Sequence, residues 1–187
     1  NELLLQQSDG SFVAAAGFPS GSAFTSSLAL GDVDGDGRLD VLVGNSWRTD
    51  GECNPFIPWK LAELLLQQSD GSFVALAGLP VLTSPQMQID MPGAFVSVAL
   101  GDVDGDGRLD VLMGIRHQIR SDLLWLQLLL QQSDGSFLAV AGFPGDNIGR
   151  NPHSVLLGDV DGDGRLDVLV CTHGANELLL QQSDGSW

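Results

Sequence analysis

The apolar residues of this chain fall into short runs of Val, Leu, Ala and Phe, separated by clusters of Gly, Asp, Ser and Pro. Short apolar runs between turn-forming residues are typical of β-strands, and signals for helices are nearly absent. Residues 3–5 and 41–43 are apolar at three consecutive positions, so these strands are expected to be buried on both faces. The pattern predicts an all-β protein.

Two cassettes alternate along the chain. The first, GDVDGDGRLDV, occupies residues 31–41 and returns unchanged at 101–111 and 158–168. The second is ELLLQQSDGSF at 2–12 and 63–73, with close variants at 127–137 and 177–187. Each cassette predicts a hairpin: strands 28–33 and 40–44 flank an Asp-rich loop, and strands 3–7 and 11–16 flank Asp9-Gly10 in a type I′ turn. One repeat is therefore an antiparallel meander of four strands, A to D.

The Asp-rich loops place carboxylates at positions 1, 3, 5 and 9. Isolated Asp and Gly residues often only form turns, but three identical copies favour a metal site. Alternate residues of a curled loop can aim oxygens at one hard cation, and this donor set suits calcium better than magnesium. The Arg at position 7 is expected to offer its carbonyl and turn its side chain to solvent, while the following Leu anchors the loop in the core. Position 12 lacks the Glu of an EF-hand.

The first loop aspartates stand at 32, 102 and 159, which are 70 and 57 residues apart. A four-stranded unit recurring at this period is typical of a β-propeller blade. A β-sandwich is the alternative, but a sandwich has no reason to repeat one metal hairpin. The interpretation is an all-β propeller of four-stranded antiparallel blades with calcium in the A–B loops.

The loop DVDGDGRLDVLVG followed by a C–D hairpin resembles the FG-GAP or VCBS repeat of integrin-α-type propellers. The resemblance covers essentially the whole chain and implies a propeller with calcium in its A–B loops. This chain differs from the family in two ways. The family usually builds about seven blades, whereas this chain has three metal loops, and family repeats usually diverge, whereas these repeats are nearly identical. By this resemblance, the carboxylates and the Arg carbonyls of three loops would hold three Ca²⁺ per chain: Asp32, Asp34, Asp36, Arg38 and Asp40; Asp102, Asp104, Asp106, Arg108 and Asp110; and Asp159, Asp161, Asp163, Arg165 and Asp167.

The expected organisation is a single partial propeller over residues 1–187. It comprises a C–D hairpin at 1–17, blades at 26–79 and 95–143, and a third blade at 153–187 that lacks most of its outer strand. Three and a fraction blades leave sheet faces open. Either the chain is a fragment of a longer array, or two copies complete one ring, and we expect a homodimer.

The net charge is −16, from 24 acidic and 8 basic side chains, which disfavours nucleic-acid binding. No apolar run approaches the roughly 20 residues that span a bilayer, and this segment contains no signal peptide. Cys53 and Cys171 are compatible with a disulfide or with two free thiols. Millimolar calcium outside the cell suits loops without a position-12 Glu, so the expected location is extracellular or at the cell surface.

The connections B–C and D–A carry nearly all the sequence variation, and exposed loops on a rigid scaffold are the usual place for recognition. A protein or glycan ligand is the first hypothesis, with the tryptophans capping the core or an oligomer contact as the alternative. No catalytic motif is present; a polysaccharide-acting enzyme domain using His117, His153 or His173 and a purely self-assembling scaffold are the other hypotheses. The candidate ligand residues are Trp47, Arg48, Trp59, Arg116, His117, Trp125 and Arg150.

Overall fold

The computed structural model describes residues 2–15, 18, 24–46, 61–76, 79–80, 94–117, 124–141, 143–144, 152–172 and 174–187. These residues form thirteen strands and no helix, and therefore no helix that could cross a membrane. The strands are β1 (Leu4–Gln6), β2 (Phe12–Ala14), β3 (Phe24–Gly31), β4 (Asp40–Ser46), β5 (Ala62–Gln67), β6 (Phe73–Ala75), β7 (Ala94–Gly101), β8 (Asp110–His117), β9 (Leu124–Gln131), β10 (Phe137–Ala139), β11 (Pro152–Gly158), β12 (Asp167–Thr172) and β13 (Glu177–Leu179).

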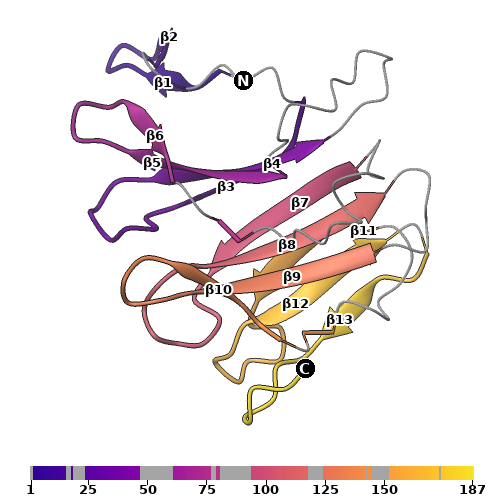
Figure 1. The fold of residues 1–187 in the computed structure, drawn as a ribbon. Coiled ribbons are helices and arrows are strands. Elements are labelled where there is room, and N and C mark those ends of the chain that lie inside the picture. The colour runs from indigo at the N-terminus through magenta and orange to yellow at the C-terminus, as the bar shows by residue number, and fades with distance from the viewer. Residues whose placement is uncertain are drawn as a thin grey trace.

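The strands pair into four antiparallel sheets, each a meander in chain order. We call β3–β6 blade 1, β7–β10 blade 2 and β11–β13 blade 3; β1 and β2 form a separate hairpin. Figure 1 shows the sheets following one another from the hairpin at the N-terminus to blade 3 at the C-terminus. The prediction of an all-β chain built from four-stranded antiparallel sheets is confirmed.

Strand β4 illustrates why these sequences form strands with two buried faces. Val41, Leu42 and Val43 are all buried, although successive side chains of a strand point to opposite sides. Leu42 packs towards blade 2, whereas Val41 and Val43 join a cluster with Leu3 of the N-terminal segment. A continuous apolar run is thus the sequence that a sheet needs when it lies between two others.

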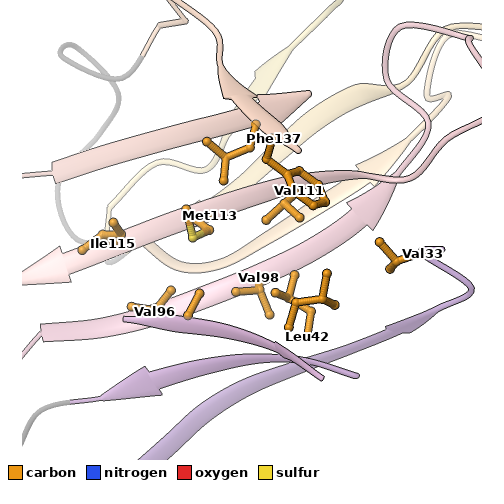
Figure 2. Packing of buried hydrophobic residues seen from close by; sticks show 11 residues of the cluster. Val33, Leu42, Val96, Val98, Val111, Met113, Ile115 and Phe137 are labelled. Carbon is orange, nitrogen blue, oxygen red and sulfur yellow. The ribbon is translucent and has the colours of Figure 1, made fainter. Parts of the chain in front are cut away.

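The blades pack face to face through continuous apolar cores. Between blades 1 and 2, Leu42 lies beside Val98 in a cluster that also holds Met113 and Phe137, and Val33 lies at one end of the same layer (Figure 2). The equivalent layer between blades 2 and 3 is a separate cluster that includes Leu112 and Val168. Repetition of one interface explains why the same apolar positions recur in each cassette.

The A strands of neighbouring blades are also joined by serine hydroxyls. Ser26 Oγ donates to the Val96 carbonyl at 2.6 Å, and the Val98 amide donates to Ser27 Oγ at 3.2 Å. Between blades 2 and 3, the Val155 amide donates to Ser97 Oγ at 3.1 Å. These hydroxyls satisfy backbone groups at the free edge of each A strand, where β-pairing ends.

The outer face of the last blade lacks this cover, and that of the first blade has it only at β4, where Leu3 packs against Val41 and Val43. On blade 1, Leu28 and Leu30 are exposed, whereas Val98 and Val155, which are equivalent to Leu28, are buried against the blade before them. On the opposite face of blade 3, Leu156, Val160 and Leu178 are exposed. The β3 part of the blade 1 face and the outer face of blade 3 therefore remain open in the described part of the chain, and each matches one side of an internal interface.

Three local predictions were wrong. The apolar run at residues 3–5 is not buried on both faces: Leu4 and Leu5 are exposed, because only Leu3 packs against blade 1 and no described strand covers the other side of the β1–β2 hairpin. The Asp9-Gly10 hairpin is not a two-residue type I′ turn: the Gly10 amide donates to the Gln7 carbonyl at 2.9 Å, so Ser8 and Asp9 are the central residues. Gly10 follows with φ of 83°, the arrangement of a three-residue loop with a bulge. The strands beside the variable connections are also longer than expected, since β8 continues to His117 and β9 begins at Leu124.

Candidate metal sites

Each Asp-rich loop is folded by its own aspartates. In the loop between β3 and β4, the two Asp32 oxygens accept hydrogen bonds from the amides of Asp36 at 3.0 Å and Gly37 at 2.8 Å. Asp34 accepts a further bond from the Asp36 amide at 3.2 Å. Gly37 has φ of 86°, a conformation that a side chain would strain. The loop therefore curls with its backbone amides around the first aspartate.

Asp40, at position 9, joins the loop to the body of the blade. Its side chain is fully buried as the first residue of β4. One carboxylate oxygen accepts from the Val33 amide and the other from the Gln67 amide, both at 2.8 Å. The carboxylate thus links the loop to the end of strand β5. This bond pattern returns at Asp110 and Asp167.

The loop carboxylates gather closely enough to bind one ion. In each loop, one carboxylate oxygen from each of three aspartates lies within 4.8 Å of the other two. Hydrogen bonds from amides leave further lone pairs on these oxygens, and an all-oxygen donor set is what calcium takes. The donor set therefore fits a hard divalent cation. The three groups are Asp32, Asp34 and Asp36; Asp102, Asp104 and Asp110; and Asp159, Asp161 and Asp167.

Crowding and burial change the acidity of these carboxyls. Burial raises the pKa of Asp34, and the charges of Asp40 and Asp32 raise it further. Burial also raises the pKa of Asp110, despite hydrogen bonds from the backbone. The pKa of Asp167 is instead lowered, chiefly by the hydrogen bond from the Val160 amide.

The expected orientation of the loop arginines was wrong. Arg38 does not point freely to solvent: its Nη2 pairs with Asp36, and its Nε donates to the Gln67 carbonyl at 3.0 Å. Arg108 and Arg165 repeat both contacts. Each guanidinium offsets one carboxylate and holds the loop against the end of strand C. The assignment of the Arg carbonyls as metal ligands stays a prediction.

The expectation for the following leucine was correct for two loops and wrong for one. Leu109 packs into the core between blades 1 and 2, and Leu166 into the core between blades 2 and 3. Leu39 is 57% exposed. The leucine packs on the preceding blade, not on its own, and the β1–β2 hairpin does not cover Leu39. Its anchoring thus depends on a neighbour that the local sequence does not specify.

The candidate ligand face is only partly described. Trp47, Arg48, Trp59 and Arg150, with His173, lie outside the described residues. His117 and Trp125 lie in β8 and β9, and their side chains are likewise outside the description.

Arg116 lies near the end of β8, and its Nη1 is 3.1 Å from Nδ1 of His153 on β11. The sequence predicted both residues in loops; the structure places them on adjacent strands of neighbouring blades. Cys171, at the end of β12, is a free thiol in the described part of the chain.

A pocket of about 260 Å³ lies between the first loop and blade 2. Asp32 and Asp34 line it from blade 1, and Arg108 and Gln131 from blade 2. Gln131 is not among the site residues predicted from the sequence. The sequence does carry a signal for it: a Gln follows the apolar LLL run in every copy of the ELLLQQSDGSF cassette.

Successive antiparallel meanders, with an acidic loop joining the first two strands of each, define a β-propeller with one acidic loop per blade. The FG-GAP-like repeat family matches residues 120–170, and the FG-GAP repeat family matches residues 24–54. The chain belongs to the FG-GAP, integrin-alpha-like repeat family. The predicted resemblance and propeller fold class are confirmed.

Curated relatives agree with this assignment. Human integrin alpha-IIb is 30% identical over 174 residues, which cover 87% of this chain and 16% of the integrin subunit. Mouse integrin alpha-IIb is 29% identical over the same length. Human cartilage acidic protein 1 is 29% identical over 180 residues, or 93% of this chain and 24% of that protein. This chain thus spans less than a quarter of the length of these relatives.

Proposed function

We propose that this chain is a calcium-stabilised β-propeller binding module of the extracellular type. The observation that carries the proposal is the threefold repetition of an aspartate cluster on one loop geometry. In each loop, the four aspartates and the Arg carbonyl would hold one Ca²⁺, giving three ions per chain. The ion would supply positive charge and structural cross-linking, not catalysis.

The role of the metal follows from the charge of the loops. Twelve of the 24 acidic residues are loop aspartates, and in each loop one Arg pairs with one of the four carboxylates. Three Ca²⁺ would change the net charge from −16 to −16 + 6 = −10. Binding to the folded state alone stabilises it, by about 4 kcal/mol when free calcium is a thousand times the dissociation constant. The loops should therefore lose much of their stability in chelator.

Calorimetric titration of metal-free chain with CaCl₂ tests this role, together with thermal melts in calcium and in EDTA. We expect three bound ions and a melting temperature that is several degrees higher in calcium. Asp9→Asn, in a hairpin turn away from the loops, is the control and should retain all three sites. An identical melting curve in calcium and EDTA would refute the proposal.

A protein or glycan would bind through the B–C and D–A connections, on the side opposite the metal loops. The family relationship supports a binding role, and Arg116 and His153 bring two polar side chains together at this side of blades 2 and 3. A secreted or cell-surface location fits the proposed calcium dependence. Pull-downs and glycan arrays with the calcium-loaded chain test this proposed binding role, and no binding in either assay would overturn it.

A second copy of the chain would complete the ring. The open face of blade 1 (Leu28, Leu30) and that of blade 3 (Leu156, Val160, Leu178) support this, because they match the two sides of an internal blade interface. Strand β13 already pairs with β12, so a second copy would add its blades through faces and not by replacing that strand.

A further inference from the structure

Two buried glutamines reach from one blade into the metal loop of the blade before it. Gln131, at the end of β9, is 6% exposed, and its Nε2 donates to the Val33 carbonyl at 3.0 Å. Gln181 is 9% exposed and donates in the same way to the Val103 carbonyl at 3.1 Å. Val33 and Val103 each stand between the first two aspartates of a loop. Each contact therefore crosses a blade interface and ends on the backbone of a candidate metal loop.

The other half of each carboxamide has no partner. Gln131 Oε1 and Gln181 Oε1 are buried side-chain oxygens without a hydrogen bond. Exchanging the amide oxygen and nitrogen would not help, because two oxygens would then face each other at the Val carbonyl. An unpaired buried acceptor costs about 1 to 3 kcal/mol, and such a group in a native protein usually marks a missing water or ion. The same orphan arises twice, at equivalent positions of two interfaces.

The surroundings of Gln131 indicate what fills this place. Gln131 lines the inter-blade pocket together with Asp32, Asp34 and Arg108. The Arg108 guanidinium is already engaged, because its Nη2 pairs with Asp106 and its Nε donates to the Gln131 carbonyl. These two carboxylates begin the first metal loop and cannot donate hydrogen bonds when ionised. Only a donor or a cation can satisfy both the carboxylates and the orphan oxygen. A calcium ion with water in its coordination shell supplies both.

We propose that Gln131 and Gln181 each complete the calcium site of the preceding blade, with Oε1 accepting a hydrogen bond from a water bound to the ion. This inference rests on the proposed calcium binding of the loops. The first two sites are then shared between blades, and calcium ties each blade to the next. The third loop, at residues 159–167, has no such glutamine among the described residues, and its Val160 is exposed. The chain would thus hold two glutamine-supported sites and one weaker site.

Gln67 is the matched control. It occupies the equivalent position in blade 1, but no metal loop precedes it in the described structure, and it is only half-buried. The test compares three proteins by calorimetric calcium titration: the wild type, the double variant that carries both Gln131→Leu and Gln181→Leu, and the control Gln67→Leu. Mutation of a residue that supports a metal ligand in this way typically weakens metal affinity by about 10- to 100-fold. We expect two of three sites to weaken by about tenfold or more in the double variant and none in Gln67→Leu.

Substitution by Glu separates metal support from simple packing. Gln131→Glu keeps the acceptor near the ion but loses the donor to the Val33 carbonyl. We expect it to retain or raise the affinity of the first site. If Glu weakens binding as much as Leu, or if the double Leu variant binds calcium like wild type, this inference is wrong. A wild-type chain that binds no calcium would refute the proposed function itself.

If the double Leu variant does not fold, the single variants and terbium luminescence decide the question. Lifetimes in H₂O and D₂O count the waters on the bound ion. Gln131→Leu should change the lifetime of one of three sites, and unchanged lifetimes at all sites would overturn the inference.

Discussion

The blade interfaces make a sharp prediction about two glycines. Gly44 lies in β4, where an added Cβ would be 2.8 Å from the Val96 carbonyl oxygen and 3.1 Å from Val98 Cγ1 of blade 2. A carbonyl within a paired strand cannot swing aside as a side chain can. Gly158 occupies the end of β11 on the uncovered face of blade 3, and an added Cβ there meets nothing within 4 Å. Neither glycine has a left-handed φ, so Ala fits both backbones.

The magnitude follows from two opposing effects. Overpacking a close-packed interface costs about 1 to 3 kcal/mol. Replacing Gly by Ala also restricts the unfolded chain, which stabilises the protein by about 0.4 to 1 kcal/mol. Gly44→Ala should therefore destabilise by about 1 to 2 kcal/mol. Gly158→Ala should be neutral or stabilising by up to about 1 kcal/mol.

Thermal melts in calcium provide the assay, run at a dilution where sedimentation shows a monomer so that Gly158 stays uncovered. For a chain of this size, 1 kcal/mol shifts the melting temperature by about 2 to 4 °C. Gly44→Ala should melt about 2 to 8 °C below wild type, and Gly158→Ala at or slightly above it. Equal losses in the two variants, or no loss at Gly44, would show that blades 1 and 2 do not pack as described.

Two further predictions concern the open face and the turns. Leu30→Asp should shift the chain from dimer to monomer in sedimentation velocity, while Leu138→Asp, which is equally exposed at 62% but lies on an outer strand, should not. A monomeric wild type at tens of micromolar would defeat that prediction. Hydrogen bonds from the hydroxyl and amide of Ser136 lower the pKa of Asp134, so its charge stabilises the fold above the unfolded pKa of about 3.9. This stability is lost as pH falls through the lowered folded pKa. Asp134→Asn should melt below wild type at pH 7 and approach it near pH 3; a constant difference would contradict the sign.

Much of the fold and the metal loops could be predicted from local sequence. The Asp spacing, the glycine at position 6 and the strands on either side lie within about a dozen residues, so chain geometry alone brings the carboxylates together. The apolar runs likewise predict sheets buried on both sides, and Val41 to Val43 are buried in that way. The turn geometry at Asp9-Gly10 was missed because the same dipeptide serves both two- and three-residue loops.

What the sequence determined by itself is therefore the repeat: an antiparallel meander, its acidic loop and its apolar faces. Only the tertiary structure decided how each repeat meets the next. Leu39 and Leu109 have the same local sequence, yet one is exposed and the other packed, because only the second has a blade in front of it. Gln67 and Gln131 differ for the same reason. Hydrogen bonding at a blade face depends on atoms 78 or 98 residues away along the chain, and identical local sequences cannot encode that difference.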